Sequence, residues 1–228
     1  MTSTGTYGWN PSAGDITLNA FGMLQIRRPE LTASHLEDAA FQANMLMVDI
    51  SNRNPERWLM EMVVVPLTSA ATYTLPSRTI CVTAATITMP GTGDRAIGPM
   101  SAADYAVLPL KTTTAPPTSF WFSLSATPTV TLWPVPDSAT IDAGATLNLM
   151  TFRQVQDIDF ANADSVDCPY RFLDAVTTGL AARLAEVYRP EKEDKLNLRY
   201  EQRIARAIKR DQESVNISIA PSFQDYYR

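Results

Sequence analysis

Histidine beside acidic residues is the first combination to consider for catalysis, and this chain has one histidine. His35 is expected in the first turn of a helix, close to Glu37 and Asp38. A nucleophile–histidine–acid set could be built on it in principle, but no motif of a known triad accompanies it. We therefore interpret His35 as a solvated residue at the start of a helix.

The two cysteines are the next candidates, either as nucleophiles or as metal ligands. Cys81 and Cys168 lie far apart, and neither has a neighbouring base or a C-x-x-C partner. With one distant histidine they do not make a zinc site. We interpret both as packing residues, whose use fits a reducing cytosol better than a disulfide scaffold. The sequence therefore predicts no catalytic residue, no cofactor and no metal, and so no enzyme.

Two segments have some features of ligand-binding loops. Residues 91–98 (GTGDRAIG) contain the glycines of a phosphate-binding loop but lack its Gly-Lys-Ser/Thr ending, so we expect a turn. Residues 157–167 are acidic and could bind calcium, although their spacing is not that of an EF-hand loop. A solvated linker is the favoured interpretation. Its acidic side chains are Asp157, Asp159, Asp164 and Asp167.

Two tryptophans and a row of arginines are candidates for binding partners. Trp121 and Trp133, on adjacent predicted strands, could form an aromatic platform for a sugar or nucleic acid, but they fit core or edge packing equally well. The arginines recur every three or four residues along one side of the last predicted helix. A solvated face and an interface with an acidic partner explain them equally well, ahead of a nucleic-acid face. The row is Arg199, Arg203, Arg206 and Arg210.

Composition limits the classes of function. At 228 residues and 45% hydrophobic content, the chain can form one domain with an insertion, or two small domains. A net charge of −5 argues against wrapping nucleic acid on a broad basic face. No apolar run approaches the roughly 20 residues of a membrane span, and the N-terminus has no signal-peptide pattern. These features predict a soluble intracellular protein that does not contact a membrane.

Helical periodicity at both ends of the chain surrounds a β-like middle. Between residues 58 and 152 the chain is rich in Thr, Val and Pro, with short alternating runs and a hairpin over residues 119–133. The predicted fold class is α+β: a helical scaffold with an inserted, mainly antiparallel β module of six or seven strands and an extended C-terminal arm. Helices are expected at 15–26, 32–51, 168–188 and 191–213, the last two as an antiparallel hairpin; strands at 58–66, 71–75, 78–83, 85–89 and 145–152; and one or two helical turns at 101–107.

This pattern divides the chain into four parts. Residues 1–57 form an N-terminal arm and helices, 58–156 the β module, 157–213 the acidic linker and a helical hairpin that packs with 15–52, and 214–228 a docking arm. The arm alternates apolar residues and ends in aromatics, with no hairpin partner nearby, so we expect its partner on another chain. Its candidate interface residues are Val215, Ile217, Ile219, Phe223, Tyr226 and Tyr227.

The order of these elements resembles the head-to-tail connector, or adaptor, proteins of short-tailed bacteriophages, including the tail tubular protein A type. The resemblance rests on Phe21-Gly22 in a short helix, a longer helix with Ala40, Asn44 and Leu46, and a strand ending in LWPVPD at residues 132–137. A tyrosine-containing helix, PYRFLDAVTTGLAARLAEVYRPE, and a charged helix follow. The resemblance covers roughly residues 15 to 213.

This resemblance implies a virion structural protein, assembled in the host cytoplasm. It would form a ring of about twelve copies that joins the portal protein to the tail nozzle or fibres, with DNA passing through the lumen without specific binding. The helices would form the ring, the segment 214–228 would dock on the portal, and the β module would point toward the tail. A stopper or tail-completion ring is the nearest alternative, and a carbohydrate-binding β module follows.

Overall fold

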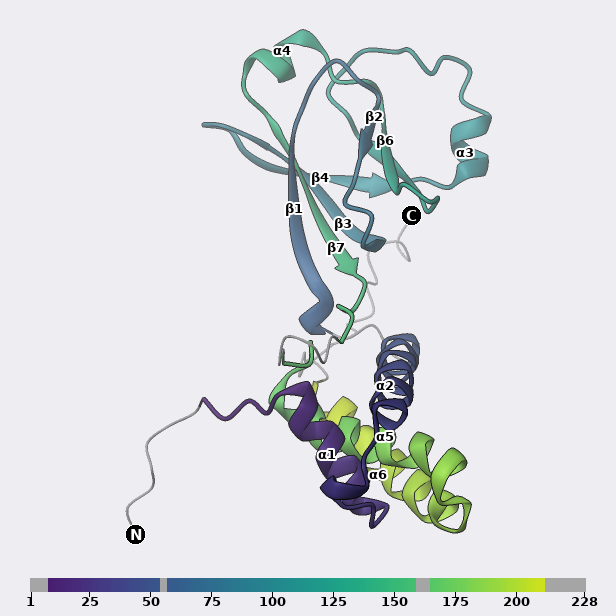
Figure 1. The fold of residues 1–228 in the computed structure, drawn as a ribbon. Coiled ribbons are helices and arrows are strands. Elements are labelled where there is room, and N and C mark those ends of the chain that lie inside the picture. Colours follow the sequence, from purple (N-terminus) through teal and green to yellow (C-terminus); the bar gives the residue numbers. More distant parts are fainter. Residues whose placement is uncertain (1–7, 54–56, 159–164, 212–228) are drawn as a thin grey trace, which may run out of the picture.

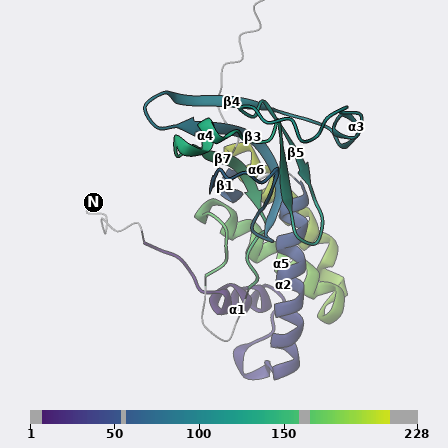
Figure 2. The ribbon, with the colours of Figure 1, turned by 90° about the horizontal axis from the view of Figure 1, so that it is seen from above.

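Helices from both ends of the chain pack together, and a seven-stranded sheet lies on one side of them (Figure 1). The computed structural model describes residues 8–53, 57–158 and 165–211. Seen from above, the sheet lies in front of the helices (Figure 2). This arrangement confirms the predicted α+β fold with an inserted sheet.

The N-terminal helices are α1 (Ala13–Met23) and α2 (Ala33–Arg53), joined through the 3-10 turn η1 (Arg28–Glu30). Helix α1 begins at Ser12, whose hydroxyl accepts a hydrogen bond from the backbone amide of Asp15 at 3.1 Å. The Asp15 carboxylate accepts one in return from the Ser12 amide at 3.3 Å. Two orphan backbone donors are satisfied by this capping box. The helix expected at 15–26 therefore begins two residues earlier.

The C-terminal helices α5 (Leu173–Tyr188) and α6 (Glu193–Asp211) form the predicted antiparallel hairpin, with the turn η4 (Pro190–Lys192) between them. Contacts cross from the start of one helix to the end of the other: Arg203 of α6 bonds to Asp174 of α5. Helix α5 starts later than predicted, because Tyr170–Phe172 form a 3-10 turn, η3, after Pro169.

Helix α5 lies at the centre and contacts α1, α2 and α6. The closest approach is at Gly179, where an added Cβ would lie 2.8 Å from Tyr200 Cε2 and 2.9 Å from Leu46 Cδ1. These distances are too short for any larger residue without movement. Glycine at this position therefore lets α2 and α6 pack against α5 together. We call α1, α2, α5 and α6 the helical layer.

The strand order of the sheet is β1-β7-β3-β4-β5-β6-β2, and neighbours are antiparallel apart from β4 and β5, which are parallel. The sheet curls, so that Ile87 and Leu149 on one half and Phe120 and Leu132 on the other share one buried core. Short helices α3 (Ala102–Ala106) and α4 (Ser138–Asp142) lie in its connections. The strands are β1 (Met60–Pro66), β2 (Thr72–Thr74), β3 (Thr79–Met89), β4 (Gly93–Pro99), β5 (Ser119–Ser123), β6 (Thr129–Trp133) and β7 (Thr146–Arg153).

Two local predictions were wrong. The runs 78–83 and 85–89 form one strand, β3, with irregular register near Cys81 and Thr83, since a bulge interrupts pairing without ending the strand. Residues 93–99, expected as a loop, form β4 between β3 and β5. The turn is limited to the residues around Gly91 and Gly93, whose φ angles are 81° and 102°. Helix α4, capped by Asp137, had no counterpart in the prediction.

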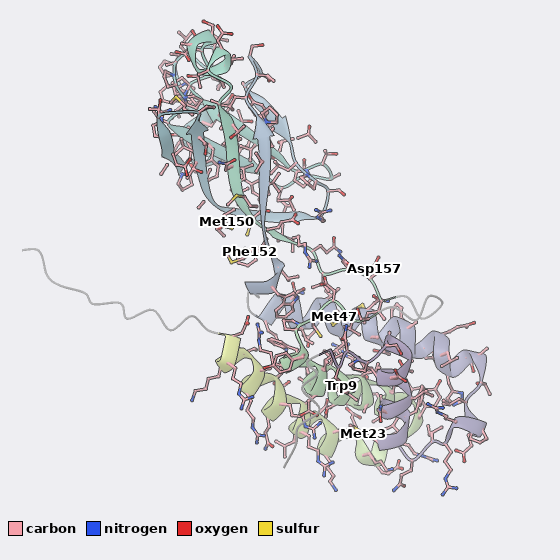
Figure 3. All side chains as sticks on the ribbon, turned by 90° about the vertical axis from the view of Figure 1, so that its left-hand side faces the viewer. Trp9, Met23, Met47, Met150, Phe152 and Asp157 are labelled. Carbon is pink, nitrogen blue, oxygen red and sulfur yellow. The ribbon has the colours of Figure 1, made fainter. Side chains whose placement is uncertain are left out.

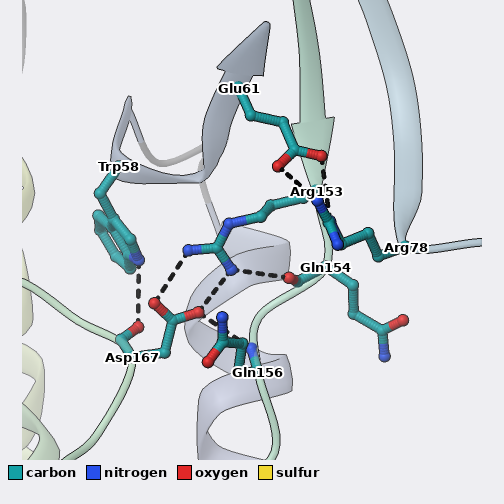
Figure 4. Close-up of polar contacts among 7 residues, drawn as sticks. All are labelled: Trp58, Glu61, Arg78, Arg153, Gln154, Gln156 and Asp167. Atoms are coloured by element: carbon teal, nitrogen blue, oxygen red, sulfur yellow. Dashed lines mark hydrogen bonds and ion pairs between the residues drawn. The ribbon is translucent and has the colours of Figure 1, made fainter. Parts of the chain in front are cut away.

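A polar junction connects the sheet to the helical layer (Figure 4). Arg153, at the end of β7, donates two hydrogen bonds to Asp167, at 2.6 and 3.0 Å. The Asp167 carboxylate also accepts from the Gln156 amide at 3.0 Å, and its backbone oxygen accepts from Trp58 Nε1 at 3.1 Å. Burial opposes ionisation of Asp167, but Arg153 and the Gln156 amide outweigh it and lower the pKa of that carboxyl.

Candidate partner interface

His35 lies in the first turn of α2, as expected, but its ring is half-buried among aromatic rings rather than solvated. Its ring stacks on Tyr188 at 4.6 Å between centroids and meets the edge of Phe21 at 5.7 Å. Nδ1 lies 2.6 Å from the Thr32 hydroxyl. Burial and a 2.5 Å hydrogen bond to Asp38 raise the pKa of Tyr188 to about 12. This cluster joins α1, α2 and α5 and gives His35 a structural role.

The cysteines and the acidic linker also have structural surroundings. Cys168 packs against the core of the helical layer, and burial raises the pKa of its thiol to about 12, so the thiol stays protonated at neutral pH. Cys81 is also a free, half-buried thiol. Asp167, expected in a solvated linker, is instead bound to Arg153. Asp159 and Asp164 lie outside the described residues.

Trp121 and Trp133 are covered by the segment that follows β4. Tyr105 of α3 stacks on Trp121 at 5.1 Å between ring centroids. Trp133 Nε1 donates to the backbone oxygen of Leu110 at 3.3 Å. Because one face of Trp121 and the polar atom of Trp133 are already in use, the packing interpretation fits these two residues better than a ligand platform.

The expected arginine row does not act as one unit. Arg203 is half-buried and donates to Asp174 Oδ1 at 2.5 Å and to the Thr178 hydroxyl. It therefore ties α6 to α5. Arg206 and Arg210 are exposed and line a cleft with Arg203, whereas Arg199 is exposed and does not line it.

This basic cleft, of about 240 Å³, lies between the first turns of α5 and the last turns of α6. Arg171, which the sequence analysis did not select, lines it as well and is ion-paired with Asp211. The four arginines outnumber the two carboxylates, Asp174 and Asp211, at this position. The cleft is thus a positive site on a chain with net charge −5.

An apolar groove of about 360 Å³ adjoins the cleft, and Asp174 lines both. The groove lies between α1 and α5. Trp9 and Tyr170 on its walls are 76% and 78% exposed, and Leu173 is buried in its floor. Trp9 and Met23 lie close together on the helical layer (Figure 3). Aromatic and methionine side chains are enriched at protein interfaces.

A second apolar surface runs along the outer side of α2. Phe41, Met45 and Val48 are exposed there, at spacings of four and three residues, and we call them the α2 ridge. Leu36, near the start of the same helix, is also exposed. The ridge was not predicted from the sequence. A second helical stripe of apolar residues is the signal that would have identified it.

The sheet has an exposed apolar face as well. Met60, Met62 and Val64 alternate on the outer side of β1, and Met62 lies opposite Met150 of β7. The candidate residues of the docking arm, 215 to 227, lie outside the described residues, and their assignment stays a prediction.

Within residues 8–53, 57–158 and 165–211, no cluster of three or more histidine, cysteine or acidic residues is arranged to hold a metal ion. In the same residues, no helix combines the length and apolar character that crossing a bilayer requires.

Comparisons with known proteins identify a family. No curated protein matches the sequence significantly. A chain in a solved structure of the neck of an empty GTA particle, computed with C6 symmetry, is similar at 14% identity over 76% of this chain and 77% of that chain, with a TM-score of 0.27. That score is too low to inform the fold or the function.

The profile of the SU10 adaptor protein family matches residues 24–221. This match confirms the predicted resemblance at the level of a phage adaptor, whereas the short-tailed connector type stays a prediction. Because the match spans most of the sequence, the chain belongs to the SU10 adaptor family, a family of bacteriophage adaptor proteins.

Proposed function

We propose that this adaptor forms a ring, of about twelve copies, that joins the portal protein to the tail of a short-tailed bacteriophage. The observation that carries this proposal is the family match over residues 24–221. The net charge of −5 supports a lumen that repels DNA, so that DNA slides through without specific binding.

The parts of the chain have separate roles in this proposal. The helical residues of 1–57 and 157–213 form the ring, and the β module of 58–156 faces the tail nozzle or fibres. Residues 214–228 dock on the portal. Asp211, three residues before that arm in the sequence, is ion-paired with Arg171, which lines the basic cleft. Arg206 and Arg210, exposed at this cleft, are available to an acidic partner surface.

The test of the ring is electron microscopy and native mass measurement of the full chain, alone and with portal protein. We expect a closed ring under at least one condition. A protein that stays monomeric with portal present would overturn the proposal.

The role of the arm has its own test. Deleting residues 214–228 should leave circular dichroism and the melting temperature unchanged while abolishing binding to the portal. Full-length binding by the shortened chain would show that another surface carries the contact.

A further inference from the structure

We propose that neighbouring copies join when the α2 ridge of one copy inserts into the apolar groove of the next. This inference rests on the proposed ring. It names the two surfaces that would form the subunit contact: Phe41, Met45 and Val48 on one side, and Trp9, Met23 and Tyr170 on the other.

The ridge is free to bind because its helix is already anchored on its other side. Ala43, Leu46 and Met47 of α2 are buried in the core of the helical layer. Phe41 is 65% exposed and Met45 and Val48 are 45% exposed. With a rise of 1.5 Å per residue, the ridge spans about 10 Å of helix. A stripe of this length can dock an amphipathic helix on an apolar groove.

The groove has the size and chemistry to accept such a ridge. Its volume of about 360 Å³ lies within the ~300–1,000 Å³ range of sites that bury ligands of moderate size. Tyr170 and Trp9 form exposed walls above the buried Leu173 and Ile16. The groove therefore has room for the Phe41 ring of a neighbouring copy. The side chains on its walls can cover that ring.

The two surfaces lie on different sides of the helical layer. Ala43 of α2 and Val176 of α5 line the same small internal cavity, so these two positions face one another. Phe41 and Asp174 each lie two residues earlier in their helices, which is about 200° around the axis. The ridge thus faces away from α5, and the groove edge at Asp174 faces away from α2. A contact between two different surfaces is a head-to-tail contact, which gives a ring when it closes.

Charge favours the same pairing. Glu37, one turn before Phe41, is exposed, and Asp38 follows it. Beside the groove are the exposed Arg206 and Arg210 of the basic cleft. Ridge-to-ridge pairing would bring like charges together, whereas ridge-to-groove pairing brings acidic residues near basic ones.

The experiment uses two full-length variants, Phe41→Asp for the ridge and Met23→Glu for the groove. Each should abolish the ring in native mass measurement, alone or on the portal. Leu124→Ser is the matched control. Leu124 is as exposed as Phe41, at 66%, but it directly follows β5 and belongs to neither the ridge nor the groove. The control variant should assemble like the wild type. Circular dichroism checks folding, and Val48→Ser is a milder ridge variant.

Mixing the two variants tests the head-to-tail geometry. The Met23→Glu copy keeps its ridge and the Phe41→Asp copy keeps its groove, so one productive contact remains. A cross-linker should trap dimers in the mixture and only monomers in each variant alone. Absence of mixed dimers would overturn the inference.

Further outcomes separate this inference from the ring itself. Rings formed by either folded variant would overturn the ridge-and-groove contact and leave the proposed function standing. Rings that form alone but no longer bind portal would assign the altered surface to the portal instead. A wild-type protein that never assembles would overturn the proposed function.

Discussion

The helical layer and the sheet bury their apolar residues in different ways. In the helical layer, small residues such as Gly179, Ala181 and Ala185 let three helices approach α5 closely. In the sheet, larger side chains such as Leu147 and Leu149 fill one face only, and the other face exposes Met62. The helical layer therefore depends on a tight fit around one helix, while the sheet depends on filling the inside of a curl.

The two regions meet through few apolar contacts and a polar junction. Leu59 before β1 and Val155 after β7 are buried in the core of the helical layer, and Arg153 binds Asp167 beside them. The sheet core shares no buried residue with the helical core among the described residues. We therefore expect the two regions to unfold as separate units coupled at this junction.

We expect the largest loss of stability from truncating a large buried side chain in each core in turn. Phe172, fully buried, packs on Trp58 at 4.7 Å between ring centroids, and Leu149 is fully buried in the sheet. Phe172→Ala should cost about 3–5 kcal/mol and Leu149→Ala about 2–5 kcal/mol. Calorimetry should show that Phe172→Ala lowers the melting temperature of the helical layer and that Leu149→Ala lowers the melting temperature of the sheet. One shared transition lowered equally by both would contradict the separation.

Breaking the junction should have the next largest effect. The Arg153 and Asp167 side chains are 15% and 18% exposed. We therefore expect Asp167→Asn to lower the free energy of unfolding by about 2 kcal/mol, a value between those for breaking an exposed and a buried ion pair. It should also weaken the coupling between the two transitions. Arg78→Gln, which removes the more exposed pair with Glu61, is the control and should change stability by less than about 1 kcal/mol.

The same junction gives a pH dependence of known sign. The pKa of Asp167 is lowered in the folded protein, so its stabilisation is present above the unfolded pKa of about 3.9 and is lost as pH falls through the lower folded value. The difference in unfolding free energy between wild type and Asp167→Asn should therefore be full at neutral pH and shrink in acid. A constant difference would contradict the proposed role of the carboxylate.

A third test concerns the close fit around α5. Gly179→Ala adds a methyl group against Tyr200 and Leu46, and this crowding should lower the free energy of unfolding by about 1–3 kcal/mol. The higher helix propensity of alanine should offset about 1 kcal/mol of that loss. We expect a net loss of about 1 kcal/mol by chemical denaturation. Gly22→Ala in α1 has no neighbour within 4 Å and should be neutral or stabilising. Stabilisation by both would show that the fit at Gly179 is loose.

Local patterns predicted most of this fold because each element carries its own periodicity. The hairpin of β5 and β6 follows from alternating Phe120 and Phe122 and the prolines after Trp133. Strand β4 was missed because its residues, GDRAIGP, have the composition of a loop. Pairing with β3 and β5 on both sides makes it a strand, and a single sequence does not display such long-range pairing.

The candidate interface was less predictable for a related reason. Arg206 and Arg210 could be selected from helical spacing, but Arg171 comes from another helix and joins them only through the packing of α5 on α6. The groove likewise combines Trp9 with Tyr170, which are far apart in the sequence. Surfaces of this kind depend on tertiary contacts, whereas the α2 ridge has a local period and could have been found.

We expect the smallest effect from removing the same type of helix cap in each of the two regions. Ser12 and Ser101 both form capping boxes with an aspartate three residues later. Ser12→Ala should cost about 1 kcal/mol, because α1 holds Ala20 and Phe21 in the core of the helical layer. Helix α3 has no buried residue, so local fraying after Ser101→Ala should change global stability by less than about 0.5 kcal/mol. Equal losses in urea denaturation would mean that α3, through Tyr105 on Trp121, supports the sheet as strongly as α1 supports the helices.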